Sequence, residues 1–246
     1  MKVSISPTKY INSSTVFCAR QPVATPSSNY QAVESGQIFS YPKIYFLGND
    51  GDFHCNADSN SSLNPKIRNF NKLGEHSARG ETLSSRRNLG RIPLIKKMGI
   101  EDVIDLRETH VSEKYPQLCE ENGLNYYNIP MDSERVPTDE IIKNLPLLFE
   151  LINKNRFYIA CAQGLHRTDI ALALNYIFNP KCTEPPILIG HIREGGIKSA
   201  DIFRRANSIK SSMTAEDMER LGLDKNFDEI FQARKKELIR YNEENL

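Results

Sequence analysis

Strand-like and helix-like segments alternate along the chain between about residues 82 and 178, and this alternation limits the possible folds more than any other feature. Three short runs have the composition of β-strands, and the first of them, 102–106, is of the kind buried in a parallel sheet. Segments with apolar residues at helical spacing accompany them. The strand-like runs are 102–106, 124–129 and 156–160, and the helical segments are 88–98, 112–121, 139–153 and 169–177. This order predicts an α/β fold with a central, mostly parallel sheet flanked by helices.

The regions before this alternation have weaker patterns. Residues 82–85 are expected to form an edge strand, and residues 43–47 a short strand that ends at a turn. The first forty residues are rich in Ser, Thr, Asn and Pro. Because such a segment cannot bury enough apolar surface to offset its ordering entropy, we expect a polar, partly mobile arm. The sequence therefore predicts an arm over residues 1–40 and one domain over residues 41–246.

The sequence after about residue 187 is charged and amphipathic, which predicts a helical C-terminal part. Its last helix is expected over residues 227–242. The expected buried stripe of this helix consists of Ile230, Phe231, Leu238 and Ile239.

Composition excludes several classes of protein. The 246 residues carry 32 Lys and Arg against 31 Asp and Glu, so bulk charge gives no reason to expect a nucleic-acid partner. No apolar run approaches the roughly 18 residues of a membrane span, and we expect no secretory signal peptide after Met1. The five cysteines are scattered and form no C-x-x-C pair, which argues against a disulfide framework or a zinc site. We therefore expect a reducing compartment such as the cytoplasm, and we interpret His54-Cys55 as part of a loop.

One segment joins a strand end, a cysteine and a helix start. The run from Cys161 to Thr168 reads CAQGLHRT. Backbone N–H groups and the helix dipole at such a place stabilise an anion, and the same field lowers a thiol pKa from about 8.5 towards 4–7. Arg167 can bind two phosphate oxygens at once, and the Thr168 hydroxyl can hydrogen-bond a thiolate. The segment therefore predicts a nucleophilic thiolate in an anion-binding loop. The alternative is a buried structural cysteine with Arg167 as a surface cap.

This run resembles the signature loop of the cysteine-based protein tyrosine phosphatases, in particular the compact dual-specificity-like group of bacterial and fungal type. Upstream, 83–86, 94–100 and 103–107 resemble the strand–helix–strand entry of that group, and 129–132 resembles the segment that brings its general acid. The resemblance implies a cysteine-phosphatase fold, and it implies that no metal or other cofactor is needed. It implies catalytic roles for Cys161, Arg167, Thr168 and Asp132, and substrate binding by Ala162, Gln163, Gly164, Leu165 and His166.

Two positions depart from the pattern of the group. Ala160 stands where a histidine usually precedes the nucleophilic cysteine and helps to order the loop. Asp169 follows Arg-Thr where a glycine is more usual, although a carboxylate in a first helical turn is favourable.

The leaving oxygen needs a proton donor. Asp132 lies 29 residues upstream of Cys161, on an expected loop before the helix at 139–153, from which it could reach a bound phosphate. The alternative is that Asp132 caps a turn, in which case Glu134 is the next candidate. His166 is expected to be structural or to face the substrate. Asp105 and Arg107 are expected to form a structural ion pair.

These observations predict a phosphomonoester hydrolase that acts through a phosphocysteine intermediate. Ala162, Gln163 and Leu165 stand where inositol-lipid phosphatases tend to carry lysines, so phosphorylated tyrosine, serine or threonine in proteins is the preferred substrate, with a small phosphomonoester as the simpler possibility. Inositol phosphates and a nucleic-acid 5′-phosphate are the alternatives. A different class remains as a rival: a phosphatase-fold module that binds phosphorylated partners without turnover. Ala160 favours the rival, and the retention of the four catalytic residues opposes it.

Overall fold

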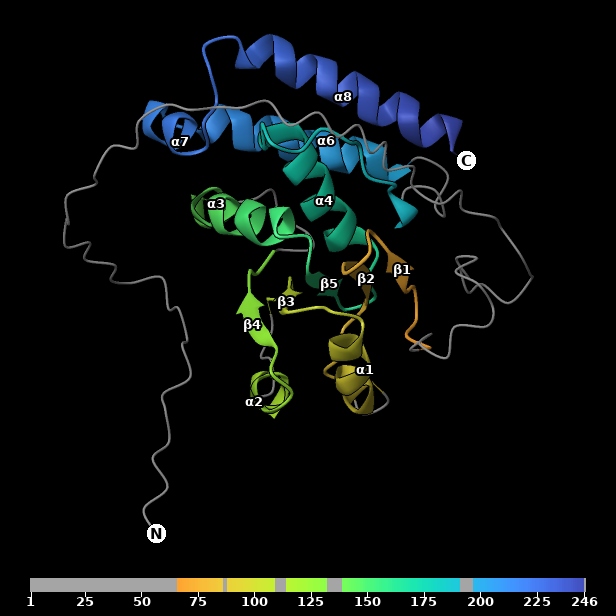
Figure 1. Cartoon of the computed structure of the whole chain (residues 1–246). Helices are drawn as coiled ribbons and strands as arrows, with labels where there is room; N and C mark the ends of the chain where they lie inside the picture. Colours follow the sequence, from red (N-terminus) through yellow and green to blue (C-terminus); the bar gives the residue numbers. More distant parts are fainter. Residues whose placement is uncertain (1–65, 86–87, 109–113, 132–138, 191–196, 246) are drawn as a thin grey trace, which may run out of the picture. The chain divides into compact units, whose positions relative to one another are not determined.

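The computed structural model describes residues 66–85, 88–108, 114–131, 139–190 and 197–245, all within the unit Ser40–Leu246. A five-stranded sheet of order β1-β2-β5-β3-β4 lies at its centre (Figure 1). The strands are β1 (Asn71–Lys72), β2 (Ala78–Glu81), β3 (Asp102–Asp105), β4 (Asn125–Asn128) and β5 (Phe157–Cys161). Only β1 runs antiparallel to its neighbour, and the other pairings are parallel. The predicted α/β fold with a mostly parallel central sheet is confirmed.

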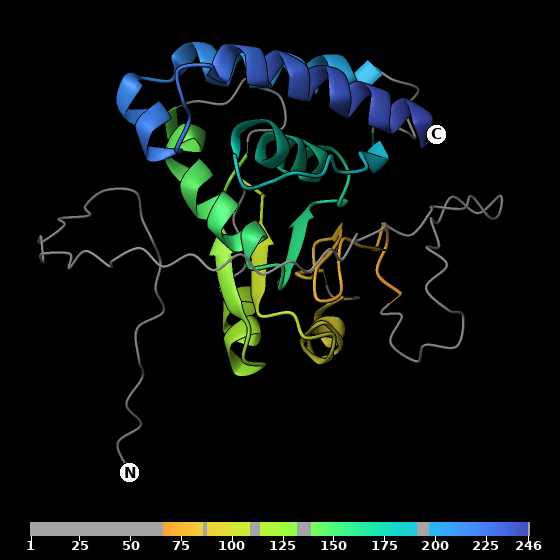
Figure 2. The same cartoon turned by 45° about the horizontal axis from the view of Figure 1, so that its top comes forward.

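Helices cover both faces of the sheet (Figures 1 and 2). One face carries the 3-10 turn η1 (Leu89–Arg91), α1 (Ile92–Lys97) and α2 (Lys114–Glu121). The other carries α3 (Asp139–Asn153) and α4 (His166–Phe178), and beyond them α6 (Ile197–Ser212), α7 (Ala215–Arg220) and α8 (Phe227–Glu244). The helical C-terminal part is thus confirmed. No helix in the described residues combines the length and apolarity needed to cross a membrane.

The strand β5 contributes to two separate apolar cores because successive strand residues face opposite sides of a sheet. Phe157, Ile159 and Cys161 belong to the core formed with α3, α4 and α8. Tyr158 and Ala160 belong to the core formed with α1 and α2. This alternation puts the Cys161 thiol on the α4 side of the sheet.

The predicted edge strand at 82–85 is wrong. The strand is Ala78–Glu81, which lies inside the sheet between β1 and β5, and residues 83–85 form a turn. Its sequence, ARGE, shows no alternation of apolar residues. One of its buried side chains is Arg79, whose hydrogen-bond partners lie in a distant part of the chain.

Two helix predictions need correction. The helix predicted from residue 169 begins at His166, because its first turn is built from polar residues that carry no apolar periodicity. In α8, Ile230 and Ile239 are exposed. The residues buried by this helix are Phe227, Phe231, Leu238 and Asn242. Ile230 is next in sequence to the buried Phe231, and Ile239 to the buried Leu238, so each is rotated by about 100° from a buried position.

Several predictions fall outside the described residues and stay predictions. They concern the arm at 1–40, the strand at 43–47, His54-Cys55, Asp132 and Glu134.

Candidate active site

Cys161 is the last residue of β5, and its side chain is buried at the carboxyl end of the parallel strands. Four residues separate it from α4, which begins at His166. Of the loop residues, Ala162 and Gln163 are exposed, whereas Gly164 and Leu165 are buried. The structure thus brings the cysteine to a helix start at a strand end, as the sequence predicts.

The carbonyl groups of this loop are held on its outer side. Asn69 Nδ2 donates to the carbonyl of Gln163 at 2.7 Å. Arg79 Nη2 donates to the carbonyls of Gly164 at 2.8 Å and Leu165 at 3.1 Å. In a planar trans peptide the C=O and the next N–H point in opposite directions. The N–H groups of residues 164, 165 and 166 therefore point away from Asn69 and Arg79, which is the arrangement of a backbone anion site.

Gly164 lets the loop pack directly on the backbone of β2. Its φ is +70°, in the left-handed region that favours glycine. A Cβ at this position would lie 2.1 Å from the carbonyl carbon of Gly80. Because the obstructing atoms belong to the backbone of β2, no side chain could move aside to make room.

The Cys161 thiol lies in a field that favours its ionised form. Burial alone would raise its pKa, but the hydrogen bonds of the Thr168 side chain and of the Gln163 and Thr168 N–H groups, together with the charge of Arg167, lower the pKa below its ordinary value. The Thr168 hydroxyl is fully buried and has no other hydrogen-bond partner among the described residues. It is therefore available to the thiolate.

Arg167 extends across the ends of neighbouring strands. Its Nη1 lies 3.5 Å from the carbonyl oxygen of Leu106, which follows β3, and 3.4 Å from that of Met131, which follows β4. The Glu108 carboxylate lies 3.9 Å away. Sequence reasoning did not identify Glu108, because only the fold brings the end of β3 to the start of α4.

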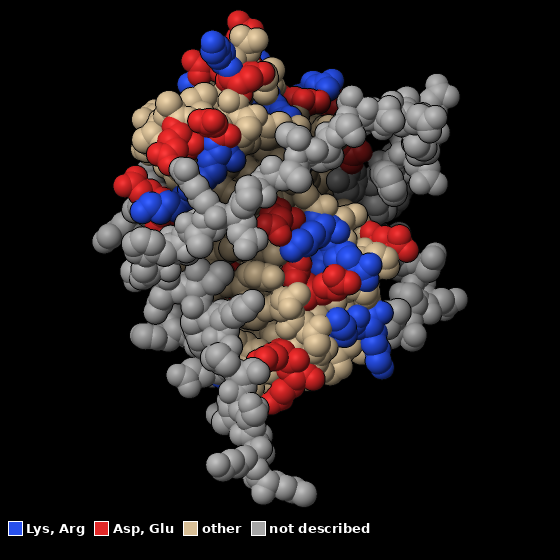
Figure 3. All heavy atoms as spheres, turned by 60° about the vertical axis from the view of Figure 1, so that its left-hand side comes forward, with Lys and Arg blue, Asp and Glu red and all other residues tan. Residues whose placement is uncertain are grey.

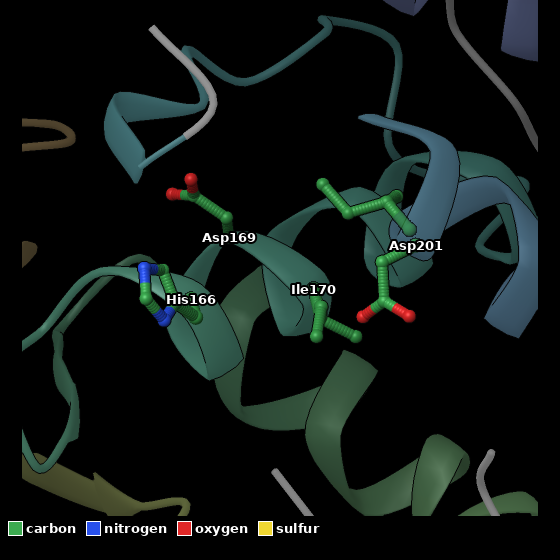
Figure 4. Close-up of a pocket in the computed structure, with 5 residues that line it drawn as sticks. His166, Asp169, Ile170 and Asp201 are labelled. Carbon is green, nitrogen blue, oxygen red and sulfur yellow. The ribbon is translucent and has the colours of Figure 1, made fainter. Parts of the chain in front are cut away.

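The remaining candidates lie around this centre. His166 lines a small hollow with Asp169, Ile170, Asp201 and Ile202, between the starts of α4 and α6 (Figure 4). The predicted structural ion pair is confirmed, because Arg107 Nη2 lies 2.6 Å from Asp105 Oδ2. Arg107 also donates to the Ser84 hydroxyl at 2.7 Å.

A short segment after α4 connects this region to the C-terminal helix. The buried Asn242 of α8 accepts a hydrogen bond from the Leu188 N–H at 2.7 Å and donates to the Pro186 carbonyl at 3.1 Å. On its other side, the same segment contacts Arg79 through the Ile187 carbonyl at 3.4 Å. We call residues 186–190 the clasped segment.

Charge on the surface is mixed. Lys and Arg side chains lie next to Asp and Glu over the described part of the face in Figure 3. Within the same described residues, no three His, Cys, Asp or Glu side chains gather as a metal site.

Comparison with known proteins gives structural neighbours only. No protein-family model matches the sequence, and no curated protein matches it. Several of the solved structures similar to the chain are described as phosphatases.

Among them, the core catalytic domain of the PP-IP phosphatase SIW14 from S. cerevisiae is 18% identical, with a TM-score of 0.36 over 70% of this chain and 93% of that chain. TpbA from P. aeruginosa is 13% identical, with a TM-score of 0.43 over 69% and 92%. A putative phosphatase from Shewanella putrefaciens CN-32 is 14% identical, with a TM-score of 0.38 over 70% and 95%. The interpretation of the site accordingly rests on its own contacts.

Proposed function

We propose that this chain is a phosphomonoester hydrolase of the dual-specificity type that forms a phosphocysteine intermediate. The observation that carries the proposal is the combination of a lowered thiol pKa at Cys161 with a loop whose carbonyls are held outward by Asn69 and Arg79. A nucleophile at the centre of an anion site is the arrangement that attack on a phosphate monoester requires.

In the proposed first step, Cys161 Sγ attacks phosphorus and the bond to the ester oxygen breaks. The N–H groups of residues 164–166 and the Arg167 guanidinium hold the non-bridging oxygens, where charge is concentrated in the transition state. Water then attacks the phosphocysteine, inorganic phosphate leaves, and the thiolate is regenerated. The Thr168 hydroxyl stabilises that thiolate as it departs.

Asp132 is the proposed proton donor to the leaving oxygen, and it is the base that activates water in the second step. Support comes from its neighbour in the chain, since Met131 accepts a hydrogen bond from Arg167 at 3.4 Å. Glu134 is the second candidate for the same role.

The Asp132→Asn variant tests this assignment. It should reduce kcat by about 10² to 10⁴-fold on alkyl phosphates, with a smaller loss on aryl phosphates whose leaving groups need little protonation. A leaving-group series for the wild type and the variant measures the difference. Full activity of the variant on the poorest leaving group would exclude Asp132 and direct the same test to Glu134.

The proposed substrates are phosphorylated tyrosine, serine or threonine side chains of proteins. The exposed residues of the loop, Ala162 and Gln163, carry no charge with which to bind a second phosphate. Comparing kcat/KM for phosphotyrosyl and phosphoseryl peptides with that for inositol polyphosphates tests this preference. Higher values for the inositol phosphates would replace the proposal with the alternative substrate class.

A binding module without turnover is separated from an enzyme by one measurement. Purified wild-type protein should release p-nitrophenol from p-nitrophenyl phosphate, and the Cys161→Ser protein should not. If the wild type binds phosphopeptides but hydrolyses neither them nor p-nitrophenyl phosphate, the hydrolase proposal is wrong.

A further inference from the structure

A buried ion pair lies directly behind the loop. Arg79 on β2 and Asp169 in the first turn of α4 approach to 2.5 Å, and their side chains are 0% and 3% exposed. Removing two charges from water is unfavourable unless each gains further hydrogen bonds. This pair has them, and most come from the loop and from the clasped segment.

The contacts of the pair link the clasped segment to the loop. Arg79 donates to the Gly164 and Leu165 carbonyls, and Asp169 Oδ2 accepts from the Gly190 N–H at 2.7 Å. Asp169 thus fixes the guanidinium. The guanidinium in turn holds the Gly164–Leu165 peptide group, and it shares the Leu165 carbonyl with the Asp169 N–H, which donates to that carbonyl at 2.8 Å. Nη2 of Arg79 carries the contacts to Asp169 and to the two loop carbonyls, and Nη1 donates to the Ile187 carbonyl of the clasped segment at 3.4 Å. A guanidinium reaches both regions with two nitrogens, whereas lysine offers one point charge.

We propose that Arg79 is a positioning residue, held in place by Asp169, that orients the peptide groups of the loop and thereby sets its affinity for an oxyanion and the reactivity of Cys161. The inference deepens the proposed function and rests on it only in that the anion is taken to be a phosphoryl group. It also gives Asp169, which departs from the usual glycine of the resembled group, a defined role.

The test uses the full chain and four variants: Arg79→Lys, Arg79→Met, Asp169→Asn and the double variant Arg79→Met/Asp169→Asn. Three quantities are measured without any turnover. They are the pH dependence of Cys161 alkylation by iodoacetamide, the Kd for tungstate by calorimetry, and the Tm.

A matched control is Asp102→Asn. Asp102 is also a buried carboxylate, and it accepts a hydrogen bond from Asn125 at 2.8 Å. It pairs with Phe157 at the opposite end of β5 from Cys161. This variant should lower Tm and leave both loop measurements unchanged.

Arg79→Lys should weaken tungstate binding about tenfold and move the midpoint of alkylation upward by about one pH unit, equivalent to a tenfold smaller thiolate fraction. Arg79→Met should do at least as much and should also lower Tm, because it leaves Asp169 buried without its cation. The double variant should recover much of that Tm but not the tungstate affinity, because the Gly164 and Leu165 carbonyls then lack the guanidinium. Recovery of both the Tm and the tungstate affinity in the double variant would show that the ion pair only stabilises the fold, and it would overturn the inference.

If Arg79→Met does not fold, Arg79→Lys and Asp169→Asn decide the question. Unchanged alkylation and tungstate binding in both would overturn the inference, as would a wild type that binds no tungstate. A wild type that binds tungstate and is alkylated at low pH, yet hydrolyses no phosphate ester, would defeat the proposed function and leave the positioning role standing.

Discussion

Cys161 and Cys119 are both buried cysteines, one on each side of the sheet, yet their thiols differ sharply. Burial and the charge of Asp105 raise the pKa of Cys119 to about 12. Burial also acts against ionisation of Cys161, but there the hydrogen bonds of Thr168 and Gln163 and the charge of Arg167 outweigh it and lower the pKa. Burial next to a carboxylate keeps the Cys119 thiol neutral and therefore inert. Hydrogen-bond donors directed at the sulfur and a positive charge nearby lower the pKa of the Cys161 thiol and make it a nucleophile.

The largest expected effect separates the two cysteines by turnover. Cys161→Ser should reduce kcat by about 10⁴-fold or more, because the hydroxyl cannot ionise in the same field. Cys119→Ser should change kcat by less than about twofold, because that thiol touches no reacting group. Steady-state hydrolysis of p-nitrophenyl phosphate measures both. Comparable losses in the two variants would contradict the assigned nucleophile.

The second prediction tests the loop that supplies the donors. Gly164 and Gly222 have nearly equal φ values, +70° and +69°, but only Gly164 has backbone atoms where a Cβ would lie. Ala at either position carries a left-handed strain of about 1–2 kcal/mol. Gly164→Ala should also displace the loop and reduce kcat/KM by about 100-fold or more, whereas Gly222→Ala should leave it unchanged. Equal kinetic losses would show that strain alone, and not the contact with Gly80, explains the effect.

The third prediction removes one donor. Thr168→Ala should raise the pKa of Cys161 and reduce kcat/KM at pH 6 by about tenfold, because one hydrogen bond to the thiolate is lost. Thr168→Ser keeps the hydroxyl and should retain most of the activity. A pH–rate profile for each variant provides the measurement. If the Ala and Ser profiles coincide, the hydroxyl does not tune the thiol.

The smallest expected effect is on stability. The folded pKa of Cys119, about 12, lies above its ordinary value of 9.0. The stability gained by keeping this thiol neutral is therefore complete below pH 9 and is lost as pH rises towards 12, by up to about 1.4 kcal/mol per pH unit. Cys161 has the opposite sign, because its lowered pKa contributes stability above pH 9 that is lost as pH falls through the folded value.

Urea unfolding at pH 8, 9 and 10 tests this difference. Cys119→Ala should unfold more easily than the wild type at pH 8, because it loses packing, and this deficit should shrink as the pH rises. A deficit that is constant across the three pH values would mean that the Cys119 thiol does not titrate differently on folding.

Patterns within one segment made β3, β4, β5 and α3 predictable, because a run of β-prone residues or an apolar helical stripe can be recognised without the rest of the fold. The same held for the grouping of Cys161, Arg167 and Thr168, which are neighbours in sequence. Arg79, Asn69 and Glu108 could not be found in this way, because each reaches the loop from a part of the chain about 50 or more residues away. β2 escaped for the same reason, since its buried arginine is explained only by its partners in that loop.

The clasped segment has a consequence for how sequences of this kind can vary. Surface connections usually tolerate insertions and deletions, because a longer loop adds little closure entropy. Residues 180, 181, 183 and 184 are exposed and fit that description. One added or deleted residue at 186–190 would instead move either the groups that meet Asn242 or those that meet the buried pair. In related sequences that keep both contacts, we expect insertions and deletions before residue 186 and a constant length over 186–190. The spacing between Pro186 and Gly190 should then help to identify such sequences, as the residues of the loop do.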